Sequence, residues 1–170
     1  MRDVLEEIGF SADPVAIDDD GLLFLSPACE DWAPIVRQHG LSAVIDLEAG
    51  LDAGIPANPN HVIYVYFPFK DEDVPTLCKL HAVARLGAAL VEARERVLIH
   101  CQMGLNRSAL VAGLVLVYNG LSGADAVLRL QARRPGALYN EVFASYLRQL
   151  PAGGLAPGAI PPADCSATLE

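Results

Sequence analysis

The chain has 170 residues, of which 52% are hydrophobic, and it carries a formal net charge of −9. This length and composition predict one globular domain with a sizeable core. The acidic balance argues against nonspecific binding to nucleic acid, which usually needs a basic surface. The first residues carry acids where a secretory signal has an apolar core, and no apolar run is long enough for a membrane span. We therefore expect a cytoplasmic protein that binds neither nucleic acid nor membranes.

Alternating apolar segments predict, in chain order, a strand, a helix, two strands, a helix, a strand and three helices. The strands are expected at 22–25, 40–47, 61–67 and 96–100, and the first four helices at 32–39, 76–94, 108–118 and 122–132. This order implies an α/β fold, with a central, mainly parallel sheet of about four to five strands flanked by helices on both faces. The domain is expected to span 1–150, and the Pro-, Gly- and Ala-rich segment 151–170 is expected to be a flexible tail.

The junction between the strand at 96–100 and the next helix carries the run HCQMGLNRS at 100–108. Such a junction points unpaired N–H groups and the positive end of the helix dipole at one small volume, so an anion is stabilised there. Gly104 lets the loop curl, and Arg107 returns to its rim with two donors for phosphate oxygens. The residues expected to bind the phosphate are Gln102, Met103, Gly104, Leu105, Asn106 and Arg107.

Cys101 lies at the start of this loop, where the same positive field favours a thiolate. A thiolate below a bound phosphoryl group is placed for in-line attack, which gives a cysteinyl-phosphate that water later hydrolyses. Ser108 is expected to donate its hydroxyl to the sulfur when Cys101 departs. This chemistry needs neither a metal ion nor another cofactor.

The pattern His-Cys-x5-Arg-Ser after a buried strand resembles the cysteine-dependent protein tyrosine phosphatases, and more closely their dual-specificity branch. The resemblance covers roughly residues 20–150, including the strand at 40–47 and the run at 134–143 into the last helix. It implies a phosphatase fold whose phosphate-binding loop joins the last strand to the following helix. It also implies a phosphomonoester hydrolase that acts on a phosphorylated protein or a small phosphomonoester, on phosphotyrosine alone or with dual specificity.

The family also implies a general acid in the loop after the strand at 61–67, which reads FPFKDEDVP from residue 67. By its position in this proline-led loop, Asp71 is the predicted acid, and Asp73 is the alternative. A positioned acid protonates the leaving oxygen as the P–O bond breaks. His100 is expected to order the phosphate-binding loop by hydrogen bonding rather than to exchange protons with the substrate.

Two other functions are compatible with the same residues. One is a phosphate-binding pseudophosphatase, an interaction module without turnover, although its usual mark is the loss of the nucleophile or the arginine. The other is a different thiol enzyme, such as a sulfurtransferase or an arsenate reductase. Neutral side chains within the loop argue against a highly phosphorylated inositol substrate. Asn106 departs from the serine or glycine that is more usual before the arginine.

The remaining cysteines, Cys29, Cys78 and Cys165, show no pairing pattern, so we expect no disulfide scaffold. One of them could act as a resolving thiol for an oxidised Cys101. Three basic residues are candidates to contribute charge near the pocket, namely Lys70, Arg133 and Arg134. The other histidines lack metal-ligand spacing, so no metal site is predicted.

Overall fold

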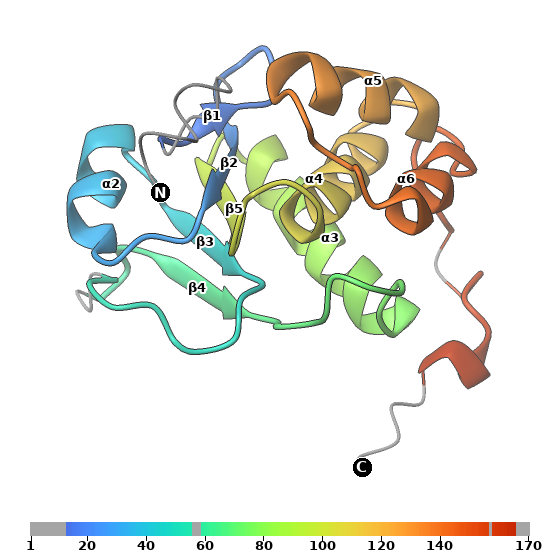
Figure 1. Cartoon of the computed structure of the whole chain (residues 1–170), viewed down its shortest axis with the longest axis horizontal. Coiled ribbons are helices and arrows are strands. Elements are labelled where there is room, and N and C mark those ends of the chain that lie inside the picture. Colours follow the sequence, from blue (N-terminus) through green and yellow to red (C-terminus); the bar gives the residue numbers. More distant parts are fainter. Residues whose placement is uncertain (1–12, 56–58, 157, 166–170) are drawn as a thin grey trace.

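The computed structural model of the chain describes residues 13–55, 59–156 and 158–165. Their strands form one five-stranded sheet in the order β1-β2-β5-β3-β4 (Figure 1). The strands are β1 (Val15–Ala16), β2 (Leu23–Pro27), β3 (Ala43–Asp46), β4 (Ile63–Tyr66) and β5 (Val97–Cys101). Only the β1–β2 pair is antiparallel among these described strands. The predicted mainly parallel sheet is confirmed.

Helices cover both faces of this sheet, as predicted (Figure 1). They are α2 (Trp32–His39), α3 (Leu77–Glu92), α4 (Arg107–Tyr118), α5 (Gly123–Arg133) and α6 (Glu141–Arg148). On one face, α2 packs Trp32 and Val36 against the strand residues Val44 and Leu98. The other four helices form the layer on the opposite face, with α4 at its centre and in contact with α3, α5 and α6. None of the helices in the described part of the chain is long and apolar enough to cross a membrane.

Local sequence explains the bounds of the elements that hold the site. All five residues of β5 are buried because this strand lies between β2 and β3, with helices on both sides. Helix α2 begins after Asp31, whose side chain caps the N–H of Ala33, and it ends at Gly40 with a left-handed φ of 59°. The short β1 was not predicted, since two residues carry no recognisable alternation.

The register of the sheet brings the carboxyl ends of three strands to one edge. Cys101 of β5 lies beside Pro27 of β2, and His100 lies beside Asp46 of β3. In a parallel sheet the loops after these strands therefore leave from the same place. Open α/β folds bind their ligands at this edge.

A buried histidine joins the helices α3, α4 and α6. His81 of α3 contacts the hydroxyl of Tyr118 through Nδ1 and that of Tyr146 through Nε2, each at 2.5 Å. A neutral imidazole satisfies both contacts because one ring nitrogen donates and the other accepts. Burial, followed by the charge of Arg85, lowers the pKa of His81 to about 4.

We expect the protein to lose stability as the pH falls from about 6.5 towards 4. An unfolded histidine binds a proton near pH 6.5, whereas His81 resists protonation in the fold, so the unfolded state gains protons first. The loss in free energy of unfolding should reach up to about 3 kcal/mol. Denaturant titrations at several pH values measure it. A His81→Gln variant should lose less over this range, and an equal loss would contradict the assignment.

The described part of the segment after Leu150 lies against α3 and α4. Gly153 donates its N–H to the carbonyl of Val117 at 2.9 Å, and Arg85 donates to the carbonyl of Leu155 at 2.8 Å. A short 3-10 helix, η1 (Pro162–Cys165), follows. The last five residues of the predicted tail, 166–170, lie outside the described residues. The domain boundary at 150 and the flexibility of the tail remain predictions.

Cys78 and Cys165 form a disulfide, with Cα atoms 5.0 Å apart. The sequence showed no pairing pattern for these cysteines, so this single disulfide was not predicted. They are 87 residues apart, so no spacing in the sequence could reveal the pair. Cys29 is a free thiol, and burial raises its pKa to about 11, which keeps it protonated and poorly reactive.

Candidate active site

The phosphate-binding loop predicted from the sequence joins β5 to α4 (Figure 1). Cys101 is the last residue of β5 and is buried, and Arg107 is the first residue of α4. Gly104 turns the loop with a φ of 64°, and a Cβ at this position would lie 2.4 Å from the carbonyl of Ser26. The loop thus rests directly on the end of β2, and only glycine combines this close approach with a left-handed backbone.

Four successive carbonyl groups of the loop accept hydrogen bonds from donors outside it. The pairs are Ala28 N to Gln102 O at 3.3 Å, Arg134 Nη2 to Met103 O at 3.3 Å, Arg134 Nε to Gly104 O at 2.6 Å and Leu138 N to Leu105 O at 2.9 Å. In a trans peptide the N–H points away from the carbonyl, and the described residues contain no cis bond. The N–H groups of residues 103–106 therefore face the inside of the loop. Successive N–H groups on one side form an anion-binding concavity.

Arg134 is a buried residue that holds this loop through two of its carbonyl groups. It is 3% exposed, and burial lowers the pKa of its guanidinium. Arg133, by contrast, is exposed and forms a surface ion pair with Asp19 at 2.6 Å. Of the basic residues considered from the sequence, Arg134 alone is shown to contact the loop, and it contacts backbone oxygens instead of facing solvent.

Ser108 lies beneath the thiol of Cys101. The Sγ atom of Cys101 and the Oγ atom of Ser108 are 3.4 Å apart, and both residues are buried. Ser108 is the second residue of α4, so the start of this helix fixes the hydroxyl beside the sulfur. The hydroxyl is thus placed to donate a hydrogen bond to a thiolate.

Arg107 is held by three groups at the rim of the loop. One terminal nitrogen donates to the carbonyls of Leu47 at 3.0 Å and Phe69 at 3.2 Å. The other forms an ion pair with Glu48 at 2.8 Å. Its Nε atom is buried without a hydrogen-bond partner among the described residues. Glu48 was not predicted as a site residue, although its position just after β3 places it at this edge of the sheet.

Asp71 lies against the same loop, through contacts with two asparagines. Asn106 Nδ2 donates to Asp71 Oδ2 at 2.9 Å, and Asn140 Nδ2 donates to Asp71 Oδ1 at 3.1 Å. The asparagines also contact each other, because the N–H of Asn140 donates to Asn106 Oδ1 at 3.0 Å. Asp73, the alternative acid, forms no hydrogen bond or ion pair with any residue in the described ranges. The structure thus brings Asp71, and not Asp73, to the loop.

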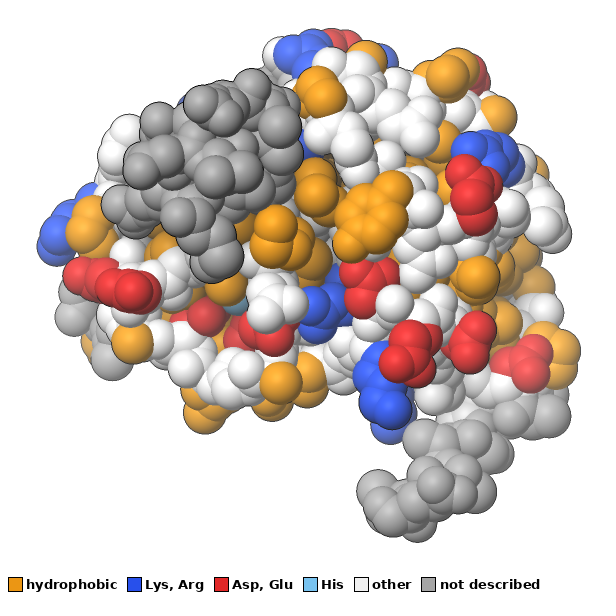
Figure 2. All heavy atoms as spheres, in the orientation of Figure 1, with side chains coloured by type: hydrophobic (Ala, Val, Ile, Leu, Met, Phe, Trp, Pro, Cys, Tyr) orange, Lys and Arg blue, Asp and Glu red, His pale blue; other side chains and the backbone are white. Residues whose placement is uncertain are grey.

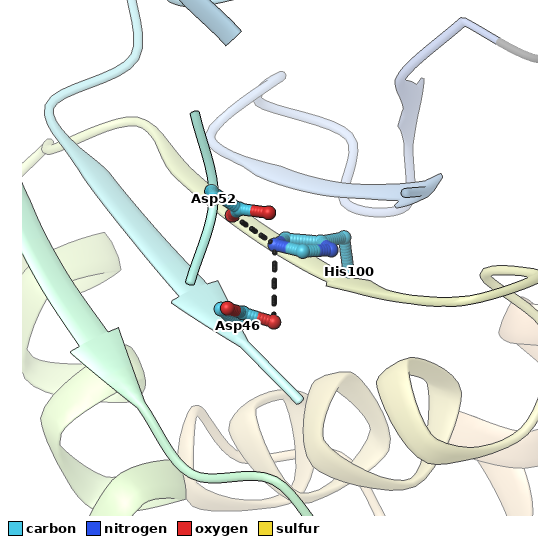
Figure 3. Close-up of side chains that lie close together, drawn as sticks. All are labelled: Asp46, Asp52 and His100. Atoms are coloured by element: carbon cyan, nitrogen blue, oxygen red, sulfur yellow. Dashed lines mark hydrogen bonds and ion pairs between the residues drawn. The ribbon is translucent and has the colours of Figure 1, made fainter. Parts of the chain in front are cut away.

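His100 points away from the loop and toward two carboxylates (Figure 3). Its Nε2 atom lies 2.7 Å from Asp52 Oδ2 and 3.5 Å from Asp46 Oδ1. The expectation that its ring bonds to the loop is wrong, since these contacts lead to β3 and to the segment after it. Burial raises the pKa of Asp46, whose other oxygen accepts from the hydroxyl of Tyr64.

Among the described residues, these three side chains form the group whose ligand atoms are close enough together to hold a metal ion. The atoms lie within 4.8 Å of one another. Each carboxylate already has a hydrogen-bond donor. Glu48 donates its N–H to Asp46 Oδ1 at 2.8 Å, and the ring of His100 contacts Asp52. The geometry is that of a buried hydrogen-bonded network linking β5 to β3, although Nδ1 of His100 has no hydrogen-bond partner among the described residues.

Exposed apolar side chains occur in the loop and in the segment that follows its contact with Leu138. Met103 of the loop is 38% exposed, Tyr139 is 64% exposed and Val142 is 48% exposed. Figure 2 shows apolar side chains gathered next to acidic and basic ones on the face in view. The loop itself contributes no charged side chain between Cys101 and Arg107.

A parallel sheet, a thiol at the end of its central strand and an arginine at the start of the next helix define the class of cysteine-dependent phosphatases. The family model of the dual specificity phosphatase catalytic domain matches residues 23–152. This is more than half of the chain, so the chain belongs to the dual specificity phosphatase family. None of the curated proteins matches the sequence significantly.

Solved structures of this class resemble the chain over most of its length. A variant of human DUSP28 is 25% identical, with a TM-score of 0.69, and the match covers 82% of this chain and 94% of that one. Tk-PTP in its active form is 26% identical, with a TM-score of 0.64, and the match covers 81% and 97%. Human tyrosine phosphatase-like serine/threonine/tyrosine-interacting protein has the same fold at 21% identity, with a TM-score of 0.65 and coverage of 82% and 95%.

Proposed function

We propose that the protein hydrolyses phosphomonoesters of phosphorylated proteins through a cysteinyl-phosphate on Cys101, and that it acts on phosphotyrosine and on phosphoserine and phosphothreonine. The observation that carries the proposal is the loop whose N–H groups 103–106 face inward, between Cys101 and Arg107. Fixed donors of this kind stabilise the charge that spreads over the equatorial oxygens of the transferring phosphoryl group. The proposal includes no metal ion.

The reaction then has two steps. In the first, the thiolate of Cys101 attacks phosphorus, the bond to the leaving oxygen breaks, and Asp71 gives that oxygen its proton. In the second, Asp71 takes a proton from the attacking water, and the S–P bond breaks to release phosphate. Ser108, 3.4 Å from the sulfur, stabilises the thiolate that departs. Arg107 binds two phosphate oxygens throughout.

Turnover with chelator present, together with a trapped intermediate, tests this proposal. The protein should hydrolyse para-nitrophenyl phosphate in excess EDTA, and acid quenching should leave phosphate on Cys101, located by mass spectrometry of the peptides. A Cys29→Ser variant is the matched control and should behave as the wild type. If the protein binds phosphotyrosine but turns over no ester, the alternative of a phosphate-binding module replaces the proposal.

Asp71→Asn should lower kcat by about 10²- to 10⁴-fold for substrates with poor leaving groups, because the leaving oxygen departs without a proton. The loss should be much smaller for aryl esters whose leaving group is already stable as an anion. Steady-state kinetics with both ester types measures the difference. Asp73→Asn is the control, and if it causes the larger loss, Asp73 is the acid.

The proposal extends to substrate class and location. Four neutral side chains occupy the loop positions around Gly104, which offers no cation for a second phosphate, so a highly phosphorylated inositol is disfavoured. A catalytic thiol has to stay reduced, which supports a cytoplasmic location. The Cys78–Cys165 disulfide involves none of the site residues.

A further inference from the structure

We propose that Asn106 is a positioning residue that holds Asp71 at the phosphate-binding loop and thereby sets how efficiently the leaving group is protonated. The inference rests on the proposed function, since it gives Asp71 the role of general acid. Asn106 is the loop residue that departs from the usual serine or glycine. Its side chain is longer than that of serine or glycine, and this length lets it reach Asp71.

The orientation of the Asn106 amide follows from its partners. The side chain is buried, with the residue 1% exposed, and its Oδ1 accepts from the backbone N–H of Asn140 at 3.0 Å. A backbone N–H can only donate, so the oxygen of the amide has to face it. The Nδ2 group is then turned to Asp71 Oδ2, at 2.9 Å. One side chain therefore fixes both the acid and the segment after α5.

Asn140 completes the arrangement from the other side of the carboxylate. Its Nδ2 donates to Asp71 Oδ1 at 3.1 Å and to the carbonyl of Glu72 at 3.1 Å. Its Oδ1 caps α6 by accepting from the N–H groups of Val142 and Phe143. Asn140 is thus anchored to a helix. Asp71 is bound through both oxygens to residues that are themselves fixed.

Neither a glycine nor a serine at position 106 could perform both tasks. Glycine has no side chain, and the single hydroxyl of serine is one bond shorter than the amide group of Asn106. Without the amide, Asp71 keeps one donor, Asn140, on an exposed loop. A catalytic group displaced by about 1 Å can cost on the order of 10²-fold in rate. The contact therefore places the proton donor before substrate arrives.

The test is the dependence of kcat on the leaving group across a series of aryl phosphates. For the wild type, kcat should change little along the series, because the leaving oxygen is protonated as it departs. Asn106→Ala should make the dependence steep. It should lower kcat by about 10- to 100-fold for the poorest leaving group and by about twofold or less for the best.

A double variant separates positioning of Asp71 from damage to the loop. In the Asp71→Asn background, adding Asn106→Ala should change kcat by about twofold or less along the series, because the group it positions is already disabled. An equal loss in both backgrounds overturns the inference. Asn119→Ala, at the opposite end of α4, is the matched control and should keep the wild-type dependence.

The two hypotheses fail in different ways. If the wild type hydrolyses none of the esters, the proposed function itself fails. If it turns over with a shallow dependence on the leaving group and Asn106→Ala keeps that shallow dependence, only the role of Asn106 is overturned. Binding of inorganic phosphate by Asn106→Ala should stay within about twofold of the wild type, because the inward N–H groups and Arg107 are unchanged.

Discussion

Replacing Cys101 with serine is expected to lower kcat by about 10⁴-fold or more, while phosphate binding is kept. Serine is similar in size, but its hydroxyl is a far weaker nucleophile than a thiolate. The inward N–H groups of residues 103–106 and the guanidinium of Arg107 do not depend on the sulfur. Turnover of para-nitrophenyl phosphate and calorimetry with inorganic phosphate measure the two effects separately.

The control for this variant is Cys29→Ser, which removes a half-buried free thiol that lies outside the phosphate-binding loop, in the connection after β2. It should leave both turnover and binding unchanged. If Cys101→Ser keeps more than about a hundredth of the wild-type kcat, the covalent mechanism is wrong. If it loses phosphate binding together with turnover, the variant has damaged the loop, and Cys101→Ala then has to be compared.

Arg107→Lys should lower kcat/KM by about 10²- to 10³-fold although the charge is kept. A lysine cannot donate two parallel hydrogen bonds to the phosphoryl oxygens, nor can it replace the contacts to the carbonyls of Leu47 and Phe69 together with Glu48. The loss should be mainly in kcat, because the missing donors act most strongly on the transition state.

Arg133→Lys is the matched control for this second variant, since Arg133 is an exposed arginine in a surface pair with Asp19. Its kinetics should equal those of the wild type. A loss for Arg107→Lys that is confined to KM would show that the residue binds substrate and transition state equally. Circular dichroism and thermal melts confirm that both variants are folded.

The sequence was sufficient for the architecture because the strands and helices carry clear local signals. The helix predicted at 32–39 has these bounds in the structure, and the strand at 96–100 differs by one residue at each end. The apolar pattern of such a segment determines whether it forms a helix or a strand. Right-handed βαβ connections then leave few ways to arrange the segments in a sheet. The two-residue β1 and the disulfide gave no such signal.

For the site, the sequence predicted what lies within one contiguous loop. Cys101, Arg107 and Ser108 are seven residues apart at most, so their spacing determines how they meet. Glu48 and Asn140 come from segments far away in the chain, and only the register of the parallel sheet and the packing of α5 and α6 bring them to the loop. A single carboxylate or amide in a connecting segment carries no signal of such a contact.

His100 shows why a residue next to the nucleophile was assigned the wrong partner. In a strand, successive side chains point to opposite faces of the sheet, so His100 and Cys101 are directed to different sides. The ring of His100 packs against Trp32 of α2, with centroids 4.5 Å apart, on the face opposite α4. Alternation along β5 alone could have excluded a contact between this ring and the loop.

The four outward carbonyl contacts of the loop make its shape depend on segments that are distant in the sequence. Three of the four donors come from the segment between α5 and α6, and the fourth comes from the connection after β2. Partial opening of the segment around Arg134 and Leu138 would free the peptide groups of the loop to rotate, while the sheet and its core stay intact. The proposed hydrolase activity would therefore be a local probe: in rising denaturant it should disappear before the global unfolding transition that fluorescence of Trp32 reports.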